Sequence, residues 1–353
     1  MIINGRFLGQ SVTGVQRFGH ETLRAAVEHG ILSSAQDRIF VPEGTLDGAA
    51  EYGGLPVHAI GAHQGHRWEQ FDLARACGDE VLLNFCNTGP VWRRKQLVVL
   101  HDAAVAANPR NYTFAFRAWY QVMIRAYGRR AAKIGTVSKN SAGEISRYFG
   151  IPAGKIEVIP ESGEHILRHA PDYSLHEEFG LEQDGYFLAV SSLAPNKNFL
   201  RVLEAVARLP DLPFKFVIVG KRNDRIFKAV SDLDVKGAIE AGFVTDAQIR
   251  ALYERAACFV FPSIYEGFGL PPLEAMNCGS PVLASRSSSM PEVCGDAAAY
   301  CDPLDVDDIA KQLGAILQST ARREEMRASG RAHAAKWTWE KAARRLQEIT
   351  DAI

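Results

Sequence analysis

The segment Phe261-Pro-Ser-Ile-Tyr-Glu-Gly-Phe-Gly-Leu-Pro-Pro-Leu-Glu-Ala-Met-Asn-Cys-Gly-Ser-Pro281 decides the fold predicted for this chain. The apolar run Cys258 to Phe261 has the composition of a buried strand, and the proline pair at the centre of the segment is typical of a helix start. The predicted order is strand, glycine loop, helix. Glu266 falls on the loop and Glu274, eight positions later, in the first helical turn. Free amides at a helix start can bind a diphosphate, and nearby carboxylates can accept hydrogen bonds from sugar hydroxyls.

Composition is that of a globular protein. The chain has 353 residues, 47% hydrophobic and 23% charged, which suits about two domains. The net charge of −1 gives no general attraction to nucleic acid, and the six cysteines form no C-x-x-C pair, which suits a reducing compartment. We find no signal peptide and no apolar run of the ~18 residues that a membrane span needs. These features predict a cytoplasmic protein, at most peripheral at the inner face of a membrane.

Short Val/Ile/Leu runs alternate with longer helical patterns, which indicates parallel sheets covered by helices. The pattern pauses between Pro160 and Gly185, where proline, glycine and polar residues mark a boundary. We predict two Rossmann-like α/β domains, residues 1–165 and 166–339, followed by a helix over 340–353. The strands expected are Met1–Asn4, Arg38–Val41, Val81–Phe85, Leu97–Leu100, Ile134–Val137, Ile156–Ile159, Tyr186–Val190, Lys215–Val219, Ile239–Ala241, Cys258–Phe261 and Pro281–Ala284.

The phrase E-G-F-G-L-P-P-L-E-A-M-x-C-G-x-P-V, with its E-x7-E spacing, resembles the donor-site segment of retaining glycosyltransferases of family 4. The resemblance covers nearly the whole chain and is sharpest between residues 242 and 300. It implies the GT-B fold, in which two Rossmann-like domains face each other across a cleft and the last helix packs back on the first domain. It also implies transfer of a hexose from a nucleoside diphosphate sugar, with retention of the anomeric configuration, without a cofactor and without a stable covalent intermediate.

The resemblance assigns roles in the second domain. Glu266 would bind the sugar, Glu274 the ribose, and Val244 the base. Lys197 would balance the charge of the leaving diphosphate. In the family an arginine stands five residues before this lysine, and here that position is Ser192, which removes one phosphate contact. The other donor-binding candidates are Asn196, Arg222, Gly267, Phe268, Gly269 and Leu270.

Two candidates lie in the first domain. Gly14, in the predicted loop after the first strand, resembles the glycine loop that faces the donor phosphate. His101 follows the strand Leu97–Leu100 and resembles the family residue that touches the donor sugar, with Asp102 as its orienting partner. A neutral imidazole suits hydrogen bonding to a sugar hydroxyl more than proton transfer. His101, Lys197 and Glu266 are the predicted catalytic residues.

Other chemistries find little support. The metal-binding pattern D-x-D occurs at Asp232-Leu-Asp234 and Asp305-Val-Asp307, both in polar contexts that suit capping, so we predict no catalytic metal. No dinucleotide fingerprint, Walker A loop or nucleophile elbow is present. Two alternatives stay open: an epimerase or phosphorylase on the same fold, and a non-catalytic sugar-nucleotide-binding subunit of a glycan assembly complex.

Three phrases bear on the substrates: Asn4-Gly-Arg-Phe-Leu8, Val12-Thr-Gly-Val-Gln-Arg17 and Leu193-Ala-Pro-Asn-Lys-Asn198. They look most like bacterial surface-polysaccharide and exopolysaccharide mannosyltransferases. GDP-mannose is therefore the first-choice donor, a UDP-sugar the alternative, and a lipid-linked glycan the expected acceptor. Segment 110–139 carries seven cations among aromatic residues and no acid. It either contacts an anionic membrane or buries its aromatic face and leaves a basic face in water.

Overall fold

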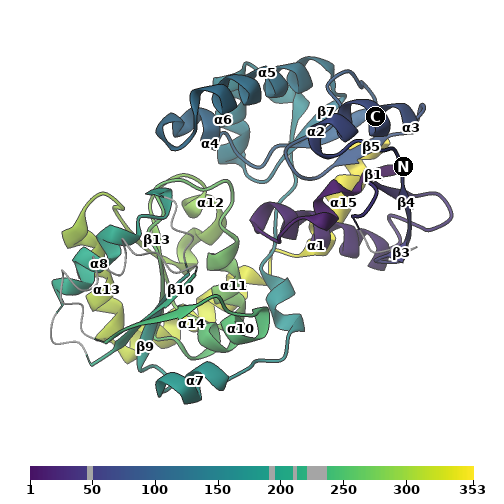
Figure 1. The fold of residues 1–353 in the computed structure, drawn as a ribbon. Coiled ribbons are helices and arrows are strands. Elements are labelled where there is room, and N and C mark those ends of the chain that lie inside the picture. The colour runs from purple at the N-terminus through teal and green to yellow at the C-terminus, as the bar shows by residue number, and fades with distance from the viewer. Residues whose placement is uncertain (46–50, 191–194, 210–212, 221–236) are drawn as a thin grey trace. The chain divides into compact units, whose positions relative to one another are not determined.

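The computed structural model describes residues 1–45, 51–190, 195–209, 213–220 and 237–353. They divide into two compact units, one formed by Met1–Glu161 with Trp339–Ile353 and the other by Ser162–Thr338. Each unit is an α/β structure built on a mostly parallel sheet (Figure 1). Ser192, Arg222 and the segment Asp232–Asp234 lie outside the described residues.

In the first unit, the described strands form an eight-stranded sheet of order β3-β4-β2-β1-β5-β6-β7-β8, parallel except for the β3–β4 pair. Its central strands are buried along their whole length, as expected of a sheet covered on both faces. The strands are β1 (Ile2–Asn4), β2 (Arg38–Val41), β3 (Glu51–Tyr52), β4 (Leu55–Ala59), β5 (Leu82–Asn84), β6 (Gln96–Val99), β7 (Lys133–Thr136) and β8 (Ile156–Val158).

The final helix of the chain belongs to this first unit. Trp339, at its start, packs edge-on against Phe18 of α1, with ring centroids 6.2 Å apart, and both side chains are buried. The helices are α1 (Gly14–Glu28), α2 (Gly65–Trp68), α3 (Ala74–Ala76), α4 (Ala104–Ala107), α5 (Phe114–Arg130), α6 (Lys139–Phe149) and α15 (Trp339–Asp351), with short 3-10 segments η1 (Gly5–Gly9), η3 (Pro109–Asn111) and η4 (Ala153–Lys155) and a π-helix η2 (Glu69–Leu73).

The second unit contains a parallel sheet of order β11-β10-β9-β12-β13-β14. Helices α8 and α13 lie on one side of it, and α10 and α11 on the other (Figure 1). The strands are β9 (Tyr186–Val190), β10 (Lys215–Val219), β11 (Ala238–Gly242), β12 (Cys258–Phe261), β13 (Val282–Ser285) and β14 (Ala299–Cys301). The helices are η5 (Glu164–Arg168), α7 (Ser174–Phe179), η6 (Pro195–Lys197), α8 (Phe199–Ala207), α10 (Asp246–Arg255), α11 (Leu270–Cys278), α12 (Met290–Cys294), η7 (Gly295–Ala297), α13 (Val306–Leu317) and α14 (Thr320–Ala334).

Both sheets have a topological switch point beside their first strand. The chain runs from β1 to β2 on one side and later returns to β5 on the other; in the same way β9 lies between β10 and β12. Open α/β sheets bind ligands outside the carboxyl ends of the strands at such points, because the two following loops diverge there. The topology thus marks one candidate ligand position in each unit.

Every strand expected from the sequence is present, with ends shifted by a single residue at most. The sequence analysis missed β3, β4 and β14. All three are only partly buried, β3 and β14 lie at sheet edges, and β4 contains Pro56, so they lack the pattern of a central buried strand.

Candidate active site

In the second unit, the loops after β9 and β12 are joined at the switch point. The amide of Ile264 donates to the Asn196 carbonyl at 2.7 Å, and the Asn196 side chain donates to the Tyr265 carbonyl at 3.0 Å. The Ser263 hydroxyl lies 2.9 Å from the same Asn196 carbonyl and also contacts the Glu266 carboxylate. These hydrogen bonds hold the loop after β9 and the loop after β12 together at the carboxyl edge of the sheet.

Lys197 and Glu266 form an ion pair on this edge. The Lys197 Nζ lies 2.7 Å from Glu266 Oε1, and the two side chains are 22% and 13% exposed. The same ammonium lies 5.1 Å from the centroid of the Phe261 ring, a cation–π distance. The pair therefore presents a positioned cation and a positioned carboxylate, partly open to a ligand, which are the groups needed to balance a phosphate and to accept from hydroxyls.

Helix α11 starts at Leu270, after Gly269. Gly269 has φ +112°, a backbone conformation that residues with a side chain rarely adopt, so glycine is required there. Pro271 and Pro272 have no amide hydrogen. The backbone amides that could donate to a diphosphate at this helix start are therefore those of Leu270 and of the loop before it.

Two serines from the loop after β13 fix the backbone of the predicted sugar-binding segment. The Ser288 hydroxyl donates to the Glu266 carbonyl at 2.6 Å, and the Ser289 hydroxyl donates to the Phe268 carbonyl at 2.6 Å. The buried Phe268 ring packs edge-on against Trp337, with centroids 5.4 Å apart. Sequence reasoning missed these serines, although a run of serines straight after a predicted strand was the available signal.

Glu274 is the fifth residue of α11, so the prediction that it lies in the first turn is wrong. Its Oε1 lies 3.0 Å from the Nε2 of the buried His165, and its Oε2 accepts from the Tyr253 hydroxyl at 3.3 Å. Burial, and after it the Glu274 charge, raises the pKa of Tyr253 well above its usual value, so the phenol remains a donor. A carboxylate has about four acceptor positions, which leaves capacity for a ligand.

The segment entering the second unit supports this carboxylate. A Cβ on Gly163 would lie 2.4 Å from the Glu274 amide nitrogen, so the backbones of the segment and of α11 touch. The Ser162 hydroxyl donates to the Trp337 carbonyl at 2.8 Å, and the Ser162 carbonyl lies 3.2 Å from His165 Nδ1. The sequence analysis treated this polar turn only as a boundary and missed His165.

Val244 lies on the loop between β11 and α10, next to Phe243, which is 92% exposed. Thr245 caps α10 by accepting from the Gln248 amide at 3.2 Å. Strand β10 separates β11 from β9, so Val244 sits toward the sheet edge, away from the joined loops.

In the first unit, Gly14 is the first residue of α1 rather than part of a loop, which corrects the prediction. The residue before it, Thr13, takes the capping position, and its amide donates to the Gln16 side chain at 3.2 Å. A capping Thr followed three residues later by Gln is a helix-start signature that the sequence analysis passed over.

His101 is buried between two acceptors. Its Nε2 lies 2.8 Å from the Phe85 carbonyl and its Nδ1 lies 3.4 Å from a Glu161 carboxylate oxygen, while its ring packs edge-on against Phe18. The Asp102 carboxylate instead accepts from the Ala104 amide at 2.8 Å. Phe85 and Glu161 orient the imidazole, a role that the sequence analysis gave to Asp102.

Among the described residues, no group of three or more His, Cys, Asp or Glu side chains is placed to hold a metal ion. Asp305 caps α13, accepting from the amides of Asp307 at 2.9 Å and Asp308 at 3.2 Å, which confirms the capping interpretation of the second D-x-D pattern. Within the same part of the chain, no helix has the length and apolarity that crossing a bilayer requires.

Known proteins that are similar to this chain are glycosyltransferases. Residues 174–333 match the family model described as glycosyl transferases group 1. O-antigen chain mannosyltransferase B of Escherichia coli is 37% identical over 220 residues, 60% of this chain and 58% of the relative. Serotype-specific mannosyltransferase WbdA of Escherichia coli is 32% identical over 309 residues, 81% of this chain and 35% of the relative.

Among solved structures, sucrose-phosphate synthase from Thermosynechococcus elongatus superposes with a TM-score of 0.78 at 16% identity, covering 99% of this chain and 97% of that one. The fold is therefore that of the GT-B glycosyltransferases. Within that class, the chain belongs to glycosyltransferase family 4. The aligned part spans only 58% and 35% of the two mannosyltransferases' own lengths.

We expect Gly163→Ala to destabilise the second unit, because the added methyl would overlap the α11 backbone, and overpacking of this kind costs about 1–3 kcal/mol. Thermal unfolding followed by circular dichroism measures the effect. Gly154→Ala is the matched control, since nothing lies within 4 Å of a Cβ there. Equal melting temperatures for the two variants would contradict the close approach of the segment to α11.

Proposed function

We propose that this chain is a retaining hexosyltransferase that moves mannose from GDP-mannose to a lipid-linked oligosaccharide or polysaccharide intermediate. The observation that carries the proposal is the Lys197–Glu266 ion pair at the switch point of the second unit. Mannose is favoured because the two relatives above are mannosyltransferases by name. A UDP-sugar donor is the alternative that the experiments below separate.

In this proposal the donor lies along the joined loops of the second unit. Lys197 and the amides around Gly269 and Leu270 hold the diphosphate, and Glu266 accepts from hydroxyls of the sugar. Glu274, held by His165 and Tyr253, accepts from the ribose diol. The remaining second-unit candidates, Asn196, Val244, Gly267 and Phe268, and the first-unit candidates, Gly14 and His101, stay predictions for the same donor.

The proposed reaction needs no protein nucleophile. The bond between the anomeric carbon and the phosphate oxygen breaks, the acceptor oxygen bonds to that carbon from the same face, and the acceptor proton passes to the departing phosphate. Lys197 stabilises the negative charge that grows on the phosphate. Glu266 orients the sugar, and its ion pair with Lys197 keeps the carboxylate in place.

Glu274→Gln should weaken nucleotide binding about tenfold, because an amide provides one acceptor oxygen where the carboxylate provides two charged ones. We would measure the thermal shift of the unmodified chain and of the variant with GDP, UDP and ADP, since a ligand that binds the native state raises its melting temperature. GDP is expected to give the largest shift in the unmodified chain.

Glu254→Gln is the matched control for this experiment. Glu254 also accepts from a tyrosine, Tyr173, at 2.7 Å, but it lies on α10 and pairs with Arg250. A larger shift with UDP would indicate a UDP-sugar donor instead of GDP-mannose. Equal nucleotide shifts in the Glu274 variant and the unmodified chain would show that Glu274 does not bind the nucleotide.

Lys197→Ala should lower turnover at saturating donor by on the order of 10²-fold or more, because the lost cation acts mainly when the phosphate departs. Product formation followed by NMR gives both the rate and the linkage, and the anomeric configuration of the donor should be retained. Near-normal turnover would exclude the role of Lys197, and an inverted centre would exclude the mechanism. A chain that binds nucleotide but neither transfers nor hydrolyses the donor would be a binding subunit instead.

The proposal extends to a membrane surface on α5. Only some of its large apolar and aromatic side chains are buried. Tyr120 and Tyr127 are in the core, whereas Phe114 is 81% and Val122 67% exposed. Arg129 and Arg130 lie in the last turn of the same helix. Apolar side chains beside cations suit an anionic lipid surface, where the acceptor lipid would lie.

We expect the chain to sediment with vesicles containing phosphatidylglycerol and not with pure phosphatidylcholine. The double variant Phe114→Ser with Val122→Ser should sediment several-fold less, because it removes the apolar contact and leaves the charges. Leu200→Ser, which changes a 52% exposed residue of the second unit, is the control. Equal sedimentation with both vesicle types would contradict this surface.

A further inference from the structure

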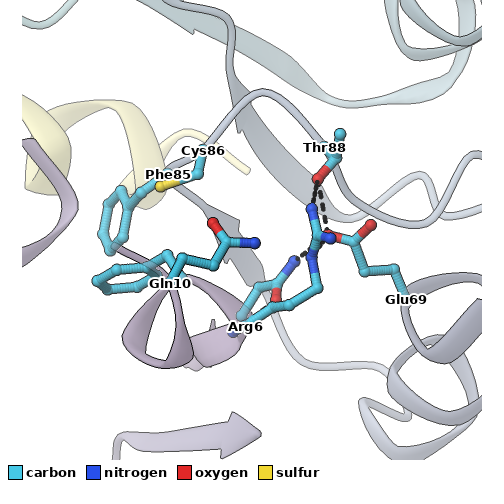
Figure 2. Close-up of a pocket in the computed structure, with 8 residues that line it drawn as sticks. Arg6, Gln10, Glu69, Phe85, Cys86 and Thr88 are labelled. Carbon is cyan, nitrogen blue, oxygen red and sulfur yellow. Dashed lines mark hydrogen bonds and ion pairs between the residues drawn. The ribbon is translucent and has the colours of Figure 1, made fainter. Parts of the chain in front are cut away.

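The first unit has a polar pocket at its own switch point. It lies between the segment after β1 and the segment after β5, and holds a hollow that is just large enough for one water molecule or one sugar hydroxyl (Figure 2). Nothing in the proposed function uses this pocket. It is lined by Asn4, Arg6, Phe7, Gln10, Glu69, Phe85, Cys86 and Thr88.

An ion pair forms the wall of this pocket. Arg6 Nε lies 3.1 Å from Glu69 Oε1, and Arg6 Nη2 donates to the Thr88 hydroxyl at 2.8 Å. The same Glu69 oxygen accepts from Asn4 at 3.1 Å, and the other oxygen faces His66 at 3.0 Å. Arg6 is thereby fixed in one orientation, with its guanidinium directed into the pocket (Figure 2).

Burial of the Glu69 carboxylate costs free energy, which suggests that the ion pair serves a function. Its side chain is 1% exposed, and removal of a carboxylate from water is only partly offset by one ion pair. Although burial raises the pKa of Glu69, hydrogen bonds from His66, Thr88 and Asn4 and the Arg6 charge together lower it, so the group stays ionised. It is presented by the π-helix η2, a form that frequently occurs at functional sites.

The pocket has donors that its own residues do not satisfy. Within the described part of the chain, Arg6 Nη1 and the side-chain nitrogen of Gln10 have no acceptor, while the Gln10 oxygen accepts from Gln16 at 2.9 Å. Figure 2 shows the amide nitrogen of Gln10 directed toward the Arg6 guanidinium. A ligand oxygen in the hollow could accept hydrogen bonds from both nitrogens in place of solvent.

The charge of the pocket selects the kind of ligand. The Arg6 cation is already matched by the Glu69 anion, so a phosphate would bring an uncompensated charge next to a buried carboxylate. A neutral group with an oxygen acceptor, such as a sugar hydroxyl, adds no charge. The arrangement parallels the Lys197–Glu266 pair, which occupies the corresponding switch point of the second unit.

We propose that the Arg6–Glu69 pocket binds one hydroxyl or hydroxymethyl group of the acceptor saccharide, with Arg6 and Gln10 as the residues that select it. This proposal rests on the proposed function, because it takes the second-unit site as the donor site. Glu69 is a positioning residue: it holds Arg6 and does not touch the sugar.

The test uses the intact chain, GDP-mannose and octyl α-D-mannopyranoside as acceptor probe. Arg6→Lys should raise the KM of the probe about tenfold, because it removes one charge-assisted hydrogen bond. It should raise the KM of the donor far less. Arg38→Lys is the matched control, since Arg38 also pairs with a carboxylate, Glu80, but at the amino end of β2. Gln10→Ala, which changes a residue at the rim, repeats the test if the Arg6 variant fails to fold.

A set of monodeoxy octyl mannosides locates the bound hydroxyl. For one analogue the loss in affinity should equal that of Arg6→Lys and should not add to it, because both changes remove the same bond. Additive effects with every analogue, an unchanged probe KM, or an equal effect of Arg38→Lys would overturn the proposal.

Saturation-transfer NMR with methyl α-D-mannopyranoside separates this proposal from the proposed function, since it requires no turnover. If no sugar nucleotide supports transfer, the proposed function fails, yet saturation transfer that is present in the unmodified chain and lost in Arg6→Lys would still support the pocket. Equal saturation transfer in both would overturn it.

Discussion

Both candidate sites depend on the topology of their sheets, because each sheet has a switch point beside its first strand. β1 and β9 each have neighbours that the chain reaches by crossovers running to opposite sides. The loops that follow the central strands therefore diverge, and no helix can cover the gap between them. Polar residues at that gap have to satisfy one another or a ligand. Both units do so with a cation from the loop after their first strand and a glutamate from another segment: Arg6 with Glu69, and Lys197 with Glu266.

The two pairs differ in how they are held. Lys197 is a point charge partly open to solvent, and its partner lies on a loop whose backbone is fixed by Ser288 and Ser289. Arg6 is a planar group locked by several bonds around a buried carboxylate. A compact point charge suits a phosphate whose charge grows during a reaction, whereas a planar fork suits a fixed hydroxyl. The same topology can thus support two chemically distinct binding tasks.

Much of the fold could be predicted because buried parallel strands are continuous apolar runs, and these are visible in the sequence. The edge strand Glu51–Tyr52 and the strand with Pro56 lack that signal. The proximity of Lys197 and Glu266 was implied by their positions after two strands, since the carboxyl ends of parallel strands share one edge, but their ion pair was not predicted. The contacts of Glu274 were not predictable in this way. His165 and Tyr253 come from a connecting segment and another helix, and only tertiary packing brings them to the carboxylate.

Helix α15 has a consequence for the order in which the chain folds. The second unit is one continuous stretch, Ser162–Thr338, so all its contacts exist once that stretch has been synthesised. The first unit instead needs Trp339 to cover Phe18, although Phe18 precedes the whole second unit in the chain. The part of α1 that α15 covers therefore stays exposed until the whole second unit has been synthesised, although Phe18 can already pack against Phe85 and His101. During that interval the nascent first unit depends on its own sheet, or on a chaperone, to avoid aggregation.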